Sequence, residues 1–127
     1  MARVLVIDDS PTVREMVRTA LEPAGHEVLQ AADGRIGVEV QRVLSCDVVI
    51  TDLIMPEKEG FETILELRRE WPQLEIIAVS GGSAVLNKTD LLRAARSFGA
   101  GQTISKPFTA RQLVDSVAQA ISTRPSS

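Results

Sequence analysis

Short apolar runs rich in β-branched residues alternate along the chain with longer amphipathic stretches, and this pair repeats five times. The apolar runs have the length of strands and cover Arg3–Asp8, Glu27–Ala31, Asp47–Thr51, Glu75–Val79 and the weaker Gln102–Ser105. The amphipathic stretches place apolar residues three or four positions apart, as on one face of a helix. They cover Pro11–Ala24, Arg35–Leu44, Gly60–Glu70, Thr89–Ser97 and Thr109–Ser122. The pattern therefore predicts five strand–helix units.

This alternation predicts an α/β fold. Strands that are apolar along their whole length, such as Arg3–Asp8, are typical of parallel sheets covered on both faces. Repeated strand–helix units connect parallel strands by right-handed crossovers. Of the two common doubly wound orders, units of this number and length fit 2-1-3-4-5 better than the Rossmann order. We expect a flavodoxin-like doubly wound five-stranded parallel sheet with five helices, in a three-layer sandwich.

The first helix has two alternative starts. Ser10 is suited to be the N-cap, because Pro11 then occupies the first helical position, where no backbone donor is needed. Thr12 and Glu15 have the spacing of a capping box, which places the start later. Gly25 is a natural C-terminal stop. In the third helix, periodicity predicts inward-facing positions at Phe61, Ile64 and Leu65, with Leu67 left open.

Composition indicates a single domain and excludes several classes of protein. We expect one domain over residues 1–122 of the 127, followed by a short polar tail at 123–127. A net charge of −3 argues against direct binding of nucleic acid. The lone cysteine, Cys46, excludes an intramolecular disulfide and a cysteine-rich zinc site. The opening apolar run is too short for a signal peptide, and no stretch approaches the roughly 18 apolar residues of a membrane span, so we expect a cytoplasmic protein without membrane insertion.

Carboxylates end two strands that the predicted order makes neighbours. In a doubly wound sheet, ligands bind beyond the carboxyl ends of the strands where the order reverses, here between the first and third strands. Asp8 and Asp9 end the first strand, and Asp52 follows the third. Three converging carboxylates are costly unless a cation lies among them. Hard oxygen ligands in so small a group suit Mg²⁺.

Two further side chains extend this group. Ser80 follows the fourth strand and Lys106 follows the fifth. A metal, a carboxylate nucleophile, a hydroxyl and an ammonium together suit phosphoryl transfer to a carboxylate. Taken singly, each residue has an ordinary explanation as a helix-start acid, a turn residue, a loop serine or a surface lysine. Their joint placement at strand ends favours the functional interpretation.

Four motifs stand in order at the predicted strand ends: Val6-Ile7-Asp8-Asp9, Asp52–Pro56 with Gly60, Ser80-Gly81, and Lys106-Pro107-Phe108. Each alone is weak, but the set is specific. With these motifs the chain resembles the CheY-like receiver domain of two-component response regulators over residues 3–121. Met1 directly before the first strand and the short tail lead us to expect the stand-alone, single-domain type.

The resemblance implies a role for each acidic residue. Asp52 is expected to be the phosphoacceptor, which forms an acyl phosphate from a partner's phosphohistidine. Asp9 is expected to ligate Mg²⁺ directly, and Asp8 through water. Asp52 itself and the backbone carbonyl of Ile54 complete the expected metal ligands.

It also implies how the phosphoryl group is held and how the signal is read. Ser80 and the Gly81 N–H are expected to bind phosphoryl oxygens, Lys106 to pair with the group, and the Lys106–Pro107 peptide to be cis. The switch aromatic of many receivers is replaced here by Thr103. We therefore expect the phosphorylation-sensitive face to be the loop after Ser80 together with the fourth helix.

The implied function is a phosphorylation-dependent switch rather than an enzyme. Its expected partners are a histidine kinase or a histidine phosphotransfer protein, and a downstream protein target that the sequence does not identify. The domain would assist its own phosphorylation and dephosphorylation. The latter should be slow, because neither Ile54 nor Gly82 can act as a base. The alternative is a pseudo-receiver that binds partners without phosphorylation. A flavin or nucleotide protein is disfavoured, because Asp8-Asp9 stands where a glycine-rich phosphate loop would lie.

Overall fold

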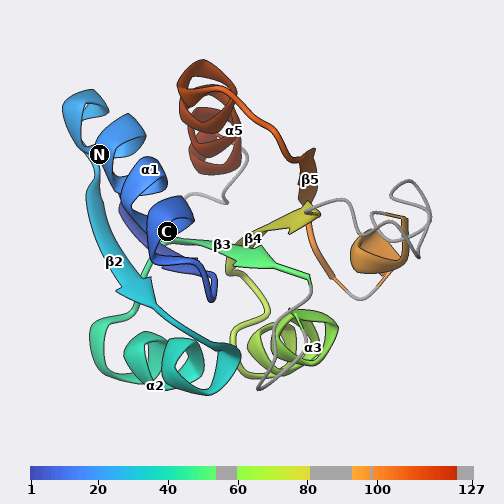
Figure 1. The fold of residues 1–127 in the computed structure, drawn as a ribbon. Helices are drawn as coiled ribbons and strands as arrows, with labels where there is room; N and C mark the ends of the chain where they lie inside the picture. Colours follow the sequence, from blue (N-terminus) through green and yellow to red (C-terminus); the bar gives the residue numbers. More distant parts are fainter. Residues whose placement is uncertain (54–59, 81–92, 98, 123–127) are drawn as a thin grey trace.

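Five parallel strands form one sheet in the order β2-β1-β3-β4-β5, as predicted (Figure 1). The structure is a computed structural model that describes residues 1–53, 60–80, 93–97 and 99–122. The strands are β1 (Arg3–Ile7), β2 (Glu27–Ala31), β3 (Val48–Asp52), β4 (Glu75–Ser80) and β5 (Gln102–Ser105). Because β1 and β3 lie side by side at the point where the order reverses, their carboxyl ends meet at the middle of one edge of the sheet.

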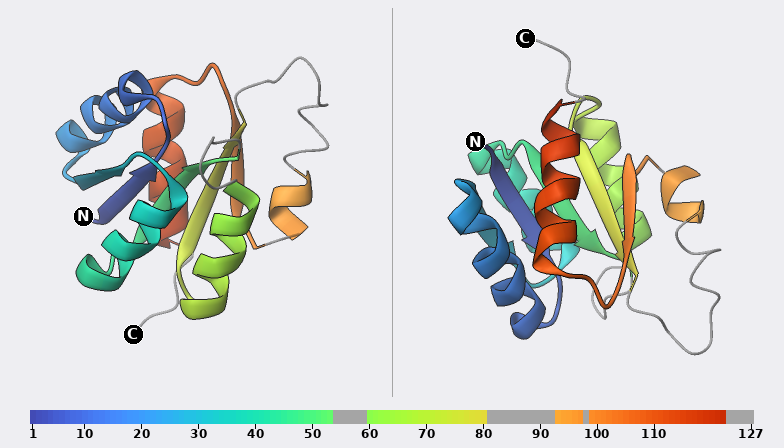
Figure 2. Two further views of the ribbon diagram at one scale, coloured as in Figure 1. Left: turned by 60° about the horizontal axis from the view of Figure 1, so that its bottom comes forward. Right: turned by 90° about the horizontal axis from the view of Figure 1, so that it is seen from above.

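Helices cover both faces of this sheet and make three layers (Figures 1 and 2). The helices are α1 (Pro11–Leu21), the short 3-10 helix η1 (Glu22–Ala24), α2 (Gly34–Leu44), α3 (Gly60–Glu70) and α5 (Ala110–Ser122). One face carries α1 and α5, and the other carries α2 and α3. Residues 93–97 are helical, within the predicted fourth helix, whose earlier part lies outside the described residues. None of the helices described is long and apolar enough to span a membrane.

Two apolar clusters, one on each face of the sheet, form the core. Successive residues of a strand point to opposite faces, so Val4 and Val6 pack under α1 and α5 while Leu5 and Ile7 pack under α2 and α3. All four side chains are at most 1% exposed. Burial on both faces explains why these strands are apolar at every position.

The strand ends differ from the prediction by one residue at the site itself. β1 ends at Ile7 rather than Asp8, because the Asp8 carboxylate accepts a hydrogen bond from the Ser10 N–H and turns the chain toward α1. β3 runs one residue further than predicted and ends on Asp52, and β4 likewise ends on Ser80. Asp52 and Ser80 are therefore part of the hydrogen-bonded sheet rather than of the loops that follow.

The start of α1 confirms Ser10 as the N-cap, and its end was predicted too late. The Ser10 hydroxyl accepts a hydrogen bond from the Val13 N–H at 3.2 Å. Glu15 pairs instead with Arg18, so the capping-box alternative is wrong. The α-helix stops at Leu21 because Pro23 has no N–H to continue the ladder.

The inward face of α3 was partly mispredicted. Ile64 and Leu67 are fully buried, whereas Leu65 is 45% exposed. Ile64 and Leu67 lie three positions apart on one face, and Leu65 lies about 100° around the helix from Ile64. The apolar residues of α3 cover more of the helix surface than the face that is buried. Periodicity alone therefore did not identify which of them face inward.

Candidate functional site

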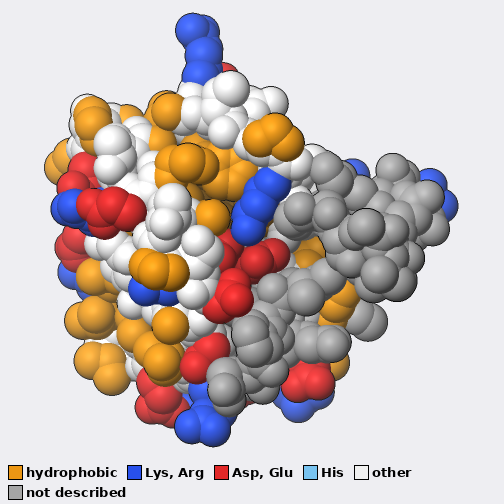
Figure 3. All heavy atoms as spheres, in the orientation of Figure 1, with side chains coloured by type: hydrophobic (Ala, Val, Ile, Leu, Met, Phe, Trp, Pro, Cys, Tyr) orange, Lys and Arg blue, Asp and Glu red, His pale blue; other side chains and the backbone are white. Residues whose placement is uncertain are grey.

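Three carboxylates meet at the carboxyl ends of β1 and β3. The side chains of Asp8, Asp9 and Asp52 each bring an oxygen to a common point, and these oxygens lie within 4.8 Å of one another. Asp8 and Asp52 are buried, and Asp9 is exposed. Acidic side chains gather near the middle of the face shown in Figure 3, with a basic side chain beside them. The predicted convergence of the three residues is therefore present.

Asp8 is held in place by four hydrogen bonds. Its carboxylate accepts from the Ser10 N–H at 2.9 Å and from the Lys106 ammonium at 3.2 Å. Its own N–H donates to the carbonyl of Ala31 at 3.1 Å. Its carbonyl accepts from the Arg14 guanidinium at 2.8 Å. Both the side chain and the backbone of Asp8 are therefore fixed.

Lys106 places a positive charge between the two buried carboxylates. Its Nζ lies 3.2 Å from Asp8 Oδ2 and 3.5 Å from Asp52 Oδ2. Burial lowers the pKa of Lys106, but the Asp52 and Asp8 carboxylates outweigh burial, and the net pKa lies above its ordinary value. The ammonium therefore stays charged at neutral pH. The Lys106–Pro107 peptide is cis, as the resemblance implied.

Ser80 brings a hydroxyl that has no hydrogen-bond partner among the residues described. It is the last residue of β4 and is 1% exposed. Its carbonyl accepts from the Lys106 N–H at 2.9 Å, which ties the ends of β4 and β5 together. A buried hydroxyl without a partner costs about 1–3 kcal/mol. Such an atom at the end of a strand is suited to bind an incoming acceptor oxygen.

Gly60 lets α3 begin directly against the backbone of Asp52. Its N–H donates to the carbonyl of Leu53 at 2.9 Å. A Cβ at this position would lie 2.0 Å from the carbonyl oxygen of Asp52 and 2.5 Å from Cα of Leu53. Only glycine allows this approach, so the Gly60 of the motif helps to position Asp52.

The donor set fits Mg²⁺. The three converging ligands are carboxylate oxygens, and Lys106 offers only one positive charge against them. Mg²⁺ typically takes one or two carboxylates and keeps several waters. The exposed Asp9 leaves the solvent side of the group accessible.

Several predicted residues are not part of the geometry above. Ile54, Gly81 and Gly82 lie outside the described residues, as does most of the loop after Ser80. Thr103 lies half-buried in β5 and pairs in register with Ala78 of β4. Arg14, in contrast, contacts the site although its sequence position suggested nothing beyond an ordinary helix residue.

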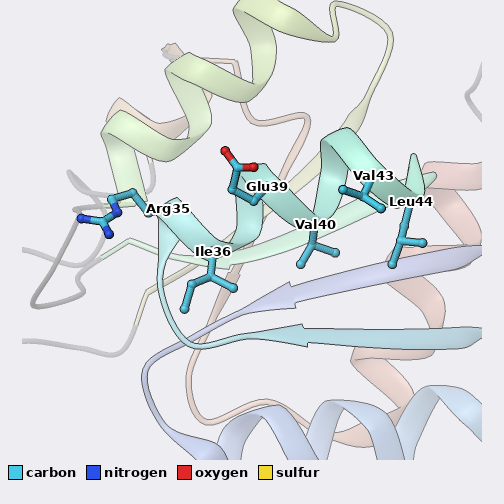
Figure 4. A pocket seen from close by; sticks show the side chains of 6 residues that line it. All are labelled: Arg35, Ile36, Glu39, Val40, Val43 and Leu44. Carbon is cyan, nitrogen blue, oxygen red and sulfur yellow. The ribbon is translucent and has the colours of Figure 1, made fainter.

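A shallow apolar hollow on α2 lies apart from these residues (Figure 4). Ile36, Val40 and Leu44 lie along one side of the helix, whereas Arg35 and Glu39 point in other directions. Among the described residues, these are the two charged side chains that line it, and neither belongs to the carboxylate group. The hollow therefore does not compete with the strand ends as a site of chemistry.

Comparison with known proteins agrees with this geometry. A family model, the response regulator receiver domain, matches residues 4–118. The chain belongs to this family. Receiver domains of this family are phosphoacceptors, and phosphorylation-dependent switching is their general function. Receiver domains generally bind Mg²⁺ at an acidic pocket, and they interact with histidine kinases and with downstream targets.

Similar receiver proteins include both short and long chains. Protein PilH of Pseudomonas aeruginosa is 34% identical, with 92% of this chain and 95% of PilH covered. Chemotaxis protein CheY of Thermotoga maritima is 33% identical, with 91% and 93% covered. The probable transcriptional regulatory protein TcrX of Mycobacterium tuberculosis is 32% identical, and the chain spans only 46% of its length.

Solved structures show the same fold. A response regulator receiver domain protein from Clostridium thermocellum superposes with a TM-score of 0.86 at 32% identity, covering 96% of this chain and 95% of that one. Chemotaxis protein CheY4 of Vibrio cholerae superposes with a TM-score of 0.84 at 30% identity, covering 94% and 98%.

Proposed function

We propose that Asp52 accepts a phosphoryl group from a phosphohistidine of a histidine kinase or histidine phosphotransfer protein. The single observation that supports this most strongly is the position of Lys106, which lies 3.5 Å from Asp52 and 3.2 Å from Asp8. A carboxylate nucleophile, a cation and a group of metal ligands then surround one point. The proposed unit is residues 1–122, acting in the cytoplasm on protein partners.

The proposed transfer is an in-line displacement at phosphorus. A carboxylate oxygen of Asp52 forms the new P–O bond, and the P–N bond to the partner's histidine breaks. The electron pair of that bond goes to the imidazole nitrogen, which takes up a proton. Lys106 offsets negative charge on the phosphoryl oxygens, and the Ser80 hydroxyl and Gly81 N–H donate hydrogen bonds to them.

Mg²⁺ is proposed to be held by Asp8, Asp9, Asp52 and the backbone carbonyl of Ile54. When bound, Mg²⁺ supplies further positive charge to neutralise the phosphoryl oxygens. The hydrogen bonds that fix Asp8 keep its carboxylate in place beside Asp52 without the ion. The Asp8 part of the proposed site is therefore preorganised by the chain itself.

The proposed switch starts at Ser80. Its buried hydroxyl has no partner among the described residues, and a phosphoryl oxygen on Asp52 would provide one. This hydrogen bond can form only when Asp52 carries a phosphoryl group, so it stabilises the conformation of the phosphorylated protein. Ser80 directly precedes the segment that we propose as the partner-binding face, together with the fourth helix. This readout requires no aromatic residue at Thr103.

Lys106→Met tests the proposal, because methionine keeps much of the side-chain volume and removes the charge. A preorganised donor at a developing charge is worth about 10²–10³ in rate, so we expect phosphorylation by acetyl phosphate with Mg²⁺ to slow on the order of a hundredfold. Intact mass against time measures the rate.

The control for Lys106→Met is Arg111→Met, which removes the same charge from a side chain that is 90% exposed on α5. It should be phosphorylated at the wild-type rate. Equal rates in wild type and Lys106→Met would contradict the role of Lys106. A wild-type protein that takes up no phosphoryl group from acetyl phosphate or a phosphohistidine protein would favour the pseudo-receiver instead.

A further inference from the structure

The guanidinium of Arg14 spans the carboxyl ends of two neighbouring strands. Arg14 lies in α1, just beyond the Asp8-Asp9 turn. Its Nη1 donates to the carbonyl of Asp8 at 2.8 Å, and its Nε donates to Oε1 of Gln30, in β2, at 3.2 Å. Arg14 therefore connects α1, the end of β1 and the edge strand of the sheet.

Asp9 depends on its backbone for its orientation. Its side chain is exposed, and its carboxylate makes no hydrogen bond within the described part of the chain. The carbonyl of Asp8 and the N–H of Asp9 belong to the same planar peptide group. A hydrogen bond that holds this carbonyl therefore also limits the direction in which the Asp9 side chain leaves the backbone.

We propose that Arg14 is a positioning residue for the metal site, which orients Asp9 toward Mg²⁺ by holding the Asp8 carbonyl. The inference rests on the proposed function, since it takes Asp9 as a direct metal ligand. Arg14 acts through the peptide and touches neither the metal nor the phosphoryl group. Partners that orient metal ligands typically change metal affinity 10- to 100-fold when they are removed.

A purely electrostatic role and a positioning role predict opposite effects on Mg²⁺ affinity when the Arg14 side chain is removed. If Arg14 acted only through its charge, its removal from the neighbourhood of a divalent cation would strengthen Mg²⁺ binding. If it holds the peptide, its removal frees Asp9 and weakens Mg²⁺ binding. The sign of the change therefore separates the two explanations.

The experiment measures the affinity of the unphosphorylated full chain for Mg²⁺ by isothermal titration calorimetry. Arg14→Met should raise the Kd for Mg²⁺ about tenfold. Arg14→Lys, which keeps one donor for the Asp8 carbonyl, should bind more tightly than Arg14→Met. The control, Arg18→Met, removes the same charge one turn further along α1, where Arg18 pairs with Glu15 and Glu22. It should leave the Kd unchanged.

A second readout keeps the test valid if Arg14→Met is less stable. Phosphorylation by acetyl phosphate is measured against Mg²⁺ concentration on the folded Arg14→Lys variant as well. In both Arg14 variants, the Mg²⁺ concentration that gives the half-maximal rate of phosphorylation should rise. The rate at saturating Mg²⁺ should stay near that of wild type. A lower saturating rate with an unchanged Mg²⁺ dependence would overturn the inference.

Failure of this inference is distinguishable from failure of the proposed function. An unchanged or tighter Kd in Arg14→Met, in a protein that is still phosphorylated on Asp52, would overturn the role of Arg14 alone. A wild-type protein that neither binds Mg²⁺ nor takes up a phosphoryl group would overturn both.

Discussion

Replacing Asp52 with asparagine should abolish phosphorylation completely. The neutral amide has no carboxylate oxygen to form an acyl phosphate, and it leaves only two of the three converging carboxylates. After incubation with acetyl phosphate and Mg²⁺, intact mass should show one added phosphoryl group in wild type and none in Asp52→Asn. The chelator EDTA should have the same effect on wild type.

The matched control for Asp52→Asn is Asp33→Asn. Asp33 is the N-cap of α2, and its carboxylate accepts from the Ile36 N–H at 2.9 Å. Asparagine caps helices about as well as aspartate, so this variant should fold and take up one phosphoryl group. If Asp52→Asn took up a phosphoryl group in the same yield as wild type, another residue would be the acceptor.

Replacing Gly60 with alanine should be strongly destabilising, although alanine is the better helix former by up to about 1 kcal/mol. The new Cβ would lie 2.0 Å from the carbonyl oxygen of Asp52 and 2.5 Å from Cα of Leu53. Both are backbone atoms, so no side chain can rotate away. Overpacking usually costs about 1–3 kcal/mol and sometimes more. Because the atoms in the way are backbone, we expect the free energy of unfolding to fall by at least about 3 kcal/mol.

Urea unfolding measures this loss, with Gly101→Ala as the control. Of the atoms that the structure describes, a Cβ at Gly101 would approach none closer than 3.6 Å, so this variant should be unchanged or up to about 1 kcal/mol more stable. Any Gly60→Ala protein that stays folded should also be phosphorylated more slowly, because Asp52 must move. A Gly60→Ala protein as stable as wild type would contradict the close approach of α3 to Asp52.

The sequence predicted the sheet order and the meeting of the three carboxylates because both follow from local patterns. Continuous apolar strands predict a parallel sheet, and in the order 2-1-3-4-5 the ends of the first and third strands must meet. The convergence of Asp8, Asp9 and Asp52 could therefore be predicted from the sequence alone. Ser80 and Lys106 were found in the same way, as the residues that end the last two strands.

Features that depend on how one helix packs against the strands were not predictable. The close approach at Gly60 brings the start of α3 against the backbone at the end of β3, and a sequence shows only that glycine is there. The hydrogen bond from Arg14 to Asp8 depends on how α1 lies against the sheet. Leu65 was misplaced because periodicity identifies a range of apolar positions and only packing decides which are buried.

The acyl phosphate itself provides the most direct test of the central claim. Sodium borohydride reduces an aspartyl phosphate to homoserine, and peptide mass mapping then locates the modified residue. After phosphorylation by a phosphohistidine protein with Mg²⁺, we expect homoserine at position 52 and at no other carboxylate. Homoserine at Asp8 or Asp9, or at no position although the phosphohistidine protein loses its phosphoryl group, would contradict the claim that Asp52 is the phosphoacceptor.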